Sequence, residues 1–183
     1  YLELYLLKKD PSMLEPTRSE LDAVLAAPRM SKIPGKELPW WWCDALFMAP
    51  PVWSRMYAAT GDQKYISYLD EEWWKTSDLL YDTKEHLYAR DASYLTKTEA
   101  NGQRMFWGRG NGWVMGGIAR TLEYLPKDDP ARPKYVKQLQ EMSARIASLQ
   151  GKDGLWRSGL LDQSNYALPE MSGSALMTYA MAW

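Results

Sequence analysis

Apolar residues recur at helical spacing along most of the chain, and this pattern predicts an almost all-α protein. The clearest case is the stretch 63–81, where Tyr65, Leu69, Trp73 and Leu80 fall on one face of a helix. The same spacing predicts further helices over residues 1–9, 17–27, 45–57, 112–125, 130–149 and 172–183.

Cap and turn signals divide these helices from one another. Thr17-Arg18-Ser19-Glu20 is a capping-box pattern and predicts a helix start at that point. We expect Pro50-Pro51 to lie in the first turns of its helix or to kink it. Asn101-Gly102 predicts the turn of a β-hairpin between extended stretches at 87–95 and 104–106. The expected fold therefore has about seven helices and one hairpin.

A weak internal repeat accompanies the helical pattern. Asp62, Lys64-Tyr65, a long helix, Asp82 and Leu87-Tyr88 are echoed later by Asp129, Lys134-Tyr135, a long helix, Asp153 and Leu155-Trp156. Alternation of helix and loop in this manner is typical of a ring of helical hairpins. Such a ring places loops at one end, where a cleft with aromatic walls can form.

Composition narrows the possible functions. The length of 183 residues suits one domain, and the net charge of −1 offers no electrostatic case for nucleic acid or an anionic membrane surface. No apolar run approaches the length of a membrane span. Ten tryptophans and twelve tyrosines against two phenylalanines fit either a surface that grips sugars or a tryptophan-rich helical core.

Histidine and cysteine are each present once, which removes several classes of site. With only His86 and Cys43, the sequence does not support a Ser-His-Asp triad, a Cys-His pair, a histidine-based metal site or an internal disulfide. His86 lies beside charged residues, and we expect it at the surface.

The stretch 40–51 places one carboxylate, Asp44, between three tryptophans and an apolar run. One interpretation is a helix cap, because the predicted helix begins at Ala45. The other is an acid/base group, because desolvation raises the pKa of a carboxyl group. The two are compatible, since a helix N-terminus also lies at the mouth of a cleft.

A second stretch, 107–113, alternates three glycines with Trp107, Arg109, Asn111 and Trp113. The glycines leave the backbone free to bend, and the stretch leads into a helix N-terminus that favours an anion. The guanidinium of Arg109 suits a carboxylate, and the two tryptophans suit the faces of sugar rings. The alternative is a tight loop with a structural arginine and two core tryptophans.

Two shorter patterns complete the candidate chemistry. Arg90 and Asp91 adjoin in an extended stretch, so we expect them to point to opposite faces, not to pair, and one of them to face the cleft. The alternative for them is a surface ion pair. We expect Glu170 or Ser172 to cap the last helix, and the small residues after them to allow close helix packing.

Three motifs together resemble a known family. Residues 41–51 (WWCDALFMAPP), 106–113 (FWGRGNGW) and 170–175 (EMSGSA) resemble the unsaturated rhamnogalacturonyl hydrolases of glycoside hydrolase family 105, which are related to the unsaturated glucuronyl hydrolases of family 88. The resemblance implies an (α/α)6 barrel, a ring of helical hairpins. The predicted helices fill only part of such a ring; the first has no cap before it, and the last ends without a closing glycine or a charged last turn. We therefore expect residues 1–183 to be a single barrel domain that is a fragment of a longer one.

The resemblance implies hydrolysis of a Δ4,5-unsaturated galacturonate at the end of a lyase-cleaved rhamnogalacturonan (pectin) oligosaccharide. An Asp protonates C4 of the vinyl ether, water adds at C5, and the resulting hemiketal collapses and releases the neighbouring sugar. By motif match this Asp is Asp44, with Trp107, Arg109 and Trp113 as wall and carboxylate-contacting groups. The alternatives are an unsaturated glucuronyl hydrolase on another lyase-cleaved polysaccharide, an inactive carbohydrate-binding relative, and a helical interaction scaffold.

The candidate substrate-binding residues lie in or beside these motifs. Arg90 is the candidate substitute for a His that many family members have in that strand, and another active-site Asp of the family, just upstream of the first helix, is absent from this chain. The resemblance implies no metal, no cofactor, an oligosaccharide partner, a monomer or homodimer, and a bacterial cytoplasmic or periplasmic location. The full binding set is Trp42, Met48, Arg90, Asp91, Trp107, Arg109, Asn111 and Trp113.

Overall fold

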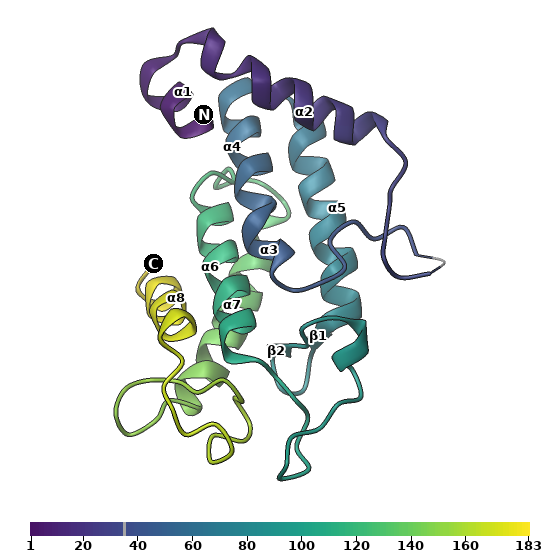
Figure 1. Ribbon diagram of the computed structural model, residues 1–183. Coiled ribbons are helices and arrows are strands. Elements are labelled where there is room, and N and C mark those ends of the chain that lie inside the picture. Colours follow the sequence, from purple (N-terminus) through teal and green to yellow (C-terminus); the bar gives the residue numbers. More distant parts are fainter. Residues whose placement is uncertain (35) are drawn as a thin grey trace.

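A computed structural model describes residues 1–34 and 36–183. The described residues form eight α-helices and one two-stranded sheet, so the almost all-α prediction is confirmed. In Figure 1, α4, α5 and α6 run roughly side by side, and α2 crosses one end of this group. The helices are α1 (Leu2–Lys8), α2 (Glu15–Ala26), α3 (Ala45–Met48), α4 (Pro50–Thr60), α5 (Gln63–Leu80), α6 (Gly108–Leu122), α7 (Arg132–Ser148) and α8 (Met171–Ala182).

Prolines set two of the helix starts. The helix expected from Ala45 is interrupted, with α3 ending at Met48 and α4 beginning at Pro50, because proline lacks the N–H that a helix interior needs. This confirms the expected effect of Pro50-Pro51. The capping-box prediction for α2 is wrong: α2 begins at Glu15 and Pro16 lies in its first turn, where proline is favoured. Thr17 therefore lies inside the helix.

The regular two-stranded sheet lies before the predicted hairpin turn, and only part of the predicted hairpin is confirmed. The two strands are β1 (Tyr81–Asp82) and β2 (Leu87–Tyr88), which pair antiparallel across a turn that ends at His86. Asn101-Gly102 does form a turn, with Gly102 at φ 79°, and the chain pairs across it: the Glu99 amide donates to the Gln103 carbonyl at 2.7 Å and the Met105 amide to the Lys97 carbonyl at 3.0 Å, on either side of an antiparallel bridge between Thr98 and Arg104. The segment before the turn is therefore 97–99 and not the predicted 87–95. The stretch 87–95 leaves the extended conformation early because the Asp91 side chain accepts a hydrogen bond from the Ser93 amide and starts a 3₁₀ turn.

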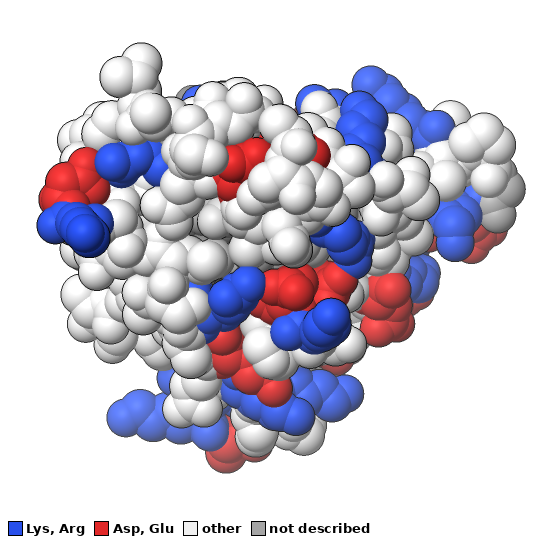
Figure 2. Space-filling model, turned by 90° about the horizontal axis from the view of Figure 1, so that it is seen from below, with Lys and Arg blue, Asp and Glu red and all other residues white. Residues whose placement is uncertain are grey.

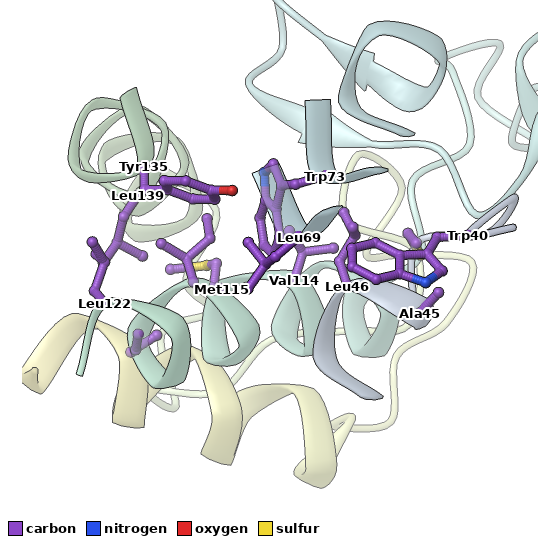
Figure 3. Close-up of a cluster of buried hydrophobic side chains, with 14 of the residues drawn as sticks. Trp40, Ala45, Leu46, Leu69, Trp73, Val114, Met115, Leu122, Tyr135 and Leu139 are labelled. Carbon is purple, nitrogen blue, oxygen red and sulfur yellow. The ribbon is translucent and has the colours of Figure 1, made fainter. Parts of the chain in front are cut away.

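The core lies between α5, α6 and α7, with Trp40 and α3 at its edge (Figure 3). Trp73 of α5 is fully buried, and its indole N–H donates to the Gln138 side chain of α7 at 3.0 Å. Four of the ten tryptophans are buried, which confirms the core interpretation for those four only. Trp42, Trp107 and Trp113 remain partly exposed. The four buried ones are Trp40, Trp53, Trp73 and Trp156.

The long helices in the two halves of the weak repeat begin in the same way, with an aspartate side chain that accepts a hydrogen bond from a nearby amide. Asp62 accepts a hydrogen bond from the Lys64 amide at the start of α5, and Asp129 accepts one from the Ala131 amide just before α7. Each aspartate therefore begins a long helix by binding an amide two residues further on.

Two of the long loops lie at one end of the helices. The segment from β2 to α6 and the segment from α7 to α8 both run below the helices in Figure 1, away from α2. Helix α8 returns to pack against α6, where a side chain at Gly112 would lie 2.9 Å from the Gly173 backbone. This close approach confirms the packing expected of the small residues at the start of α8. None of the helices in the described ranges is long and apolar enough to cross a membrane.

Candidate active site

The loop end carries a pocket of about 330 Å³. Three segments form its walls: the loop after β2, the first turn of α6, and the loop before α8. Viewed from this end, acidic side chains gather near the centre with Lys and Arg beside them (Figure 2). The lining residues are Arg90, Tyr94, Glu99, Met105, Trp107, Arg109, Ser158 and Tyr166.

The glycines at the start of α6 hold these segments together. The Gly108 amide donates to the Ser158 carbonyl at 2.8 Å, and a side chain at Gly108 would overlap the Arg157 carbonyl oxygen. A side chain at Gly110 would lie 2.9 Å from the Cys43 sulfur. The expectation of a free-bending loop here is wrong, because α6 already begins at Gly108. The stretch needs glycine for close packing instead.

Asp44 stands directly before α3, but its carboxylate accepts no hydrogen bond from the first turn of that helix. The cap interpretation is therefore wrong. The Cys43 thiol donates to Asp44 Oδ1 at 3.3 Å, and the Cys43 amide donates to the Arg90 carbonyl at 2.8 Å. Burial, followed by the negative charge of Asp44, raises the pKa of Cys43 well above its usual value, so that residue stays a neutral thiol. Asp44 itself is partly exposed.

Arg90 and Asp91 are paired, contrary to the sequence prediction. Arg90 Nε donates to Asp91 Oδ2 at 2.7 Å. The prediction assumed a continuous strand, whereas the chain turns at Asp91. The pKa of Arg90 is raised mainly by this hydrogen bond, with a smaller contribution from the charge of Asp44. Asp44 is not among the residues that line the pocket, but its neighbour Cys43 is hydrogen-bonded to the Arg90 carbonyl in the pocket wall.

The Asp91 carboxylate is buried next to the pocket wall and is fixed by hydrogen bonds. It is 5% exposed, and its Oδ1 accepts hydrogen bonds from the amide and hydroxyl of Ser93. Burial alone would raise its pKa, but the hydrogen bonds from Ser93 and Arg90 outweigh burial and lower it. Asp91 is not among the lining residues, and its contribution is to hold the Arg90 guanidinium, which lies 4.6 Å from the Tyr94 ring centroid.

Arg109 projects from the first turn of α6 into the pocket. Its guanidinium lies over the Trp107 ring, 4.5 Å from the centroid, and its Nη1 is 3.5 Å from Glu170 Oε1. Glu170 also caps α8 by accepting a hydrogen bond from the Gly173 amide, which confirms the expected cap. With 45% of its side chain exposed, Arg109 keeps donors open to a ligand.

The structure separates the remaining candidates from this pocket. Asn111 is fully buried, and its amide group bonds both polar backbone atoms of Tyr88, at 2.8 and 3.1 Å, which ties α6 to β2. Trp42 bridges to Asp91 behind the wall. Trp113 packs on Phe47, and Met48 is 53% exposed in a different hollow lined also by residues of α1 and α4. We accordingly remove Asn111 from the proposed substrate contacts.

Sequence reasoning missed several wall residues. Tyr94 and Tyr166 add aromatic faces, and Glu99 adds a carboxyl group. The only local signal for Glu99 was the Asn101-Gly102 turn beside it, which brings it to the loop end. Tyr166 had no signal, because its place depends on a loop that packs from a distant part of the chain. Within the described ranges there is no cluster of His, Cys, Asp and Glu arranged to hold a metal ion.

Comparison with known proteins identifies the relatives of this fold and pocket. An unsaturated 3S-rhamnoglycuronyl hydrolase from Formosa agariphila is 42% identical over 182 residues, which cover 93% of this chain and 48% of that protein. A second protein of that description, from Alteromonas sp. (strain LOR), is 38% identical over 147 residues, covering 80% of this chain and 36% of that protein. The chain thus spans half or less of the length of these relatives.

A solved structure gives the same relationship. A glycosyl hydrolase of family 88 from Bacteroides vulgatus matches with a TM-score of 0.92 and 34% identity, covering 100% of this chain and 51% of that one. The protein is therefore related to the all-helical glycoside hydrolases that act on unsaturated uronyl sugars. It belongs to Glycosyl Hydrolase Family 88, whose family model matches residues 1–183. The (α/α)6-barrel fold type expected from the motifs is confirmed, over about half of the matched structure.

Proposed function

We propose that the protein releases a Δ4,5-unsaturated hexuronate from an oligosaccharide, with Asp44 as the acid/base group. The observation that carries this proposal is the attachment of the residue before Asp44 to the pocket wall: the Cys43 amide donates to the Arg90 carbonyl at 2.8 Å, and Arg90 lines a pocket that combines two guanidinium groups with aromatic walls. Arginine suits the carboxylate of a uronate, and aromatic rings suit the apolar faces of sugars.

The proposed reaction follows the chemistry of an unsaturated uronate. Asp44, as the acid, gives its proton to C4, and the C4–C5 double bond becomes a cation stabilised by the ring oxygen at C5. Water adds at C5 and returns a proton to the Asp44 carboxylate. The hemiketal then opens to a C5 ketone, and the hemiacetal left at C1 expels the neighbouring sugar. Arg109 holds the substrate carboxylate in this scheme, and Trp107 and Tyr94 form the walls.

For the sugar on the leaving side we propose rhamnose. Both relatives named above carry the description 3S-rhamnoglycuronyl hydrolase, at 42% and 38% identity. These names favour a lyase-cleaved polysaccharide other than pectin, which was the alternative left open by the motifs. A panel that compares an unsaturated rhamnoglycuronyl oligosaccharide with a rhamnogalacturonan disaccharide tests this choice, and we expect the higher kcat/KM for the first.

The test of the catalytic assignment follows the absorbance of the conjugated double bond, which disappears as the uronate is hydrated. We expect Asp44→Asn to lower kcat by about 10²–10⁴-fold, the usual contribution of a general acid. The matched control is Asp128→Asn, an exposed aspartate in the loop before α7. Equal rates for the parent and Asp44→Asn would refute the assignment. Binding of the oligosaccharide without turnover would support the carbohydrate-binding alternative.

A further inference from the structure

One acidic side chain in the pocket has no partner. Glu99 is 6% exposed and lines the pocket, yet its carboxyl group makes no hydrogen bond or ion pair among the described residues. Its Oε2 is buried without a partner. The two pocket arginines both pair with other carboxylates, Arg90 with Asp91 and Arg109 with Glu170. Neither arginine forms an ion pair with Glu99.

The surroundings of Glu99 favour its neutral form. Asp162, 4% exposed, lies beside it and takes the local donors, the Asn101 amide at 3.0 Å and the Ser164 hydroxyl at 2.8 Å. Burial raises the pKa of Glu99, and the negative charge of Asp162 raises it further. The other ionisable groups that line the same pocket are Arg90, Arg109, Tyr94 and Tyr166.

The Glu99 side chain lines the pocket, where a ligand could contact it. A side chain added at Gly159 would lie 3.0 Å from Glu99 Oε1 and 2.9 Å from the Tyr166 ring, so the carboxyl group lies next to the Tyr166 wall. A protonated carboxyl group has one O–H donor, whereas a carboxylate only accepts hydrogen bonds. A carboxylate here would also repel an anionic sugar, because like charges in a shared site are unfavourable.

We infer that Glu99 binds substrate as a neutral carboxylic acid, donating a hydrogen bond to an oxygen of the sugar that fills this pocket. This role rests on the proposed function for the identity of the ligand. It is separate from the role of Asp44, since Glu99 selects and orients the substrate and transfers no proton during the reaction.

The test measures binding without turnover. In an Asp44→Asn background, the unsaturated rhamnoglycuronyl disaccharide is titrated calorimetrically at several pH values. We expect Glu99→Ala to raise Kd about five- to tenfold, the effect of losing one hydrogen bond. In the parent, binding should weaken at high pH, because Glu99 then loses its proton and with it the O–H donor. Glu99→Gln keeps a donor of similar shape at every pH, so we expect its Kd to stay within about twofold of the parent value at low pH and not to rise at high pH. Glu20→Gln, on the exposed face of α2, is the matched control.

A second measurement keeps the inference falsifiable if a variant folds poorly. The infrared difference spectrum between parent and Glu99→Gln should contain the carbonyl band of a protonated carboxyl group at neutral pH. Absence of that band, or a Glu99→Ala variant that binds as tightly as the parent, would overturn the inference. A Glu99→Gln variant as weak as Glu99→Ala would do the same. If the Glu99 variants bind as expected but the protein with Asp44 intact shows no turnover, the proposed reaction is contradicted and the inference about Glu99 is not.

Discussion

Gly117 of α6 offers the sharpest test of how the site is built. A side chain at this position would overlap the backbone carbonyl oxygen of Leu46 in α3 and lie 2.8 Å from its carbonyl carbon. Helix α3 directly follows Asp44, so the contact between α3 and α6 sets where Asp44 lies relative to the first turn of α6. Gly117→Ala should therefore force the two helices apart.

The size of the effect follows from two opposing contributions. Alanine is favoured over glycine inside a helix by about 1 kcal/mol. Inserting a methyl group into a fully packed contact costs about 1–3 kcal/mol, and more where the obstacle is backbone that cannot rotate away. Because the obstacle here is backbone, we take the cost at the upper end, about 3 kcal/mol, so that the free energy of unfolding of Gly117→Ala falls by about 2 kcal/mol net. This lowers the melting temperature by about 2–4 °C for each kcal/mol in a chain of this size.

The neighbouring glycine supplies the matched control. A side chain at Gly116 meets only side-chain atoms, those of Phe47 at 3.2 Å and Leu176 at 3.3 Å, which can adjust. Gly116→Ala should leave stability unchanged or raise it by up to about 1 kcal/mol. Thermal and urea unfolding followed by circular dichroism measure both variants. If Gly117→Ala is as stable as Gly116→Ala, the close approach of α3 to α6 is not what positions this part of the fold.

Two further predictions concern buried polar groups. Asn111→Ala should lower the free energy of unfolding by about 2–4 kcal/mol, because the amide and carbonyl of Tyr88 lose their partners in the core; urea denaturation measures this, and an unchanged midpoint would contradict it. The lowered pKa of Asp91 means that its stabilising effect is present at neutral pH and is lost as pH falls through its folded-state pKa. Acid unfolding of Asp91→Asn should accordingly depend less on pH than that of the parent, and identical profiles would refute this.

The helices that sequence predicts best are those whose ends are set by local chemistry. The expected stretch 63–81 differs from α5 by one residue, because an apolar face and the Asp62 cap both lie within the segment itself. The last helix, expected at 172–183, begins one residue earlier, at the residue after its Glu170 cap. In these cases the chain carries the whole signal within a few turns of helix.

The sequence predictions are wrong where the role of a residue depends on contacts with a distant segment of the chain. Gly108 and Gly112 are close to the backbones of Arg157 and Gly173, so nothing in their own neighbourhood separates a packed helix start from a flexible loop. Asn111 is of a residue type that often binds ligands, but its side-chain amide is hydrogen-bonded to the backbone of Tyr88. Glu99 has no motif at all, and only the fold shows that its carboxyl group faces a pocket without a partner.

The two pocket arginines, alike in sequence, differ in what they can do. Arg90 is held at 2.7 Å by a carboxylate that is itself buried and bonded to Ser93, so a ligand cannot easily take Arg90 from it. Arg109 is exposed to about the same extent as Arg90, but its Nη1 lies 3.5 Å from Glu170 Oε1, at the limit of a hydrogen bond, so this ion pair holds Arg109 more weakly. An incoming carboxylate therefore competes for Arg109 at low cost, while Arg90 adds a fixed positive charge to the wall. The different roles of the two arginines thus follow from how closely each is held by its partner, at 2.7 Å for Asp91 and 3.5 Å for Glu170, because both partners are largely buried and both arginines are about equally exposed.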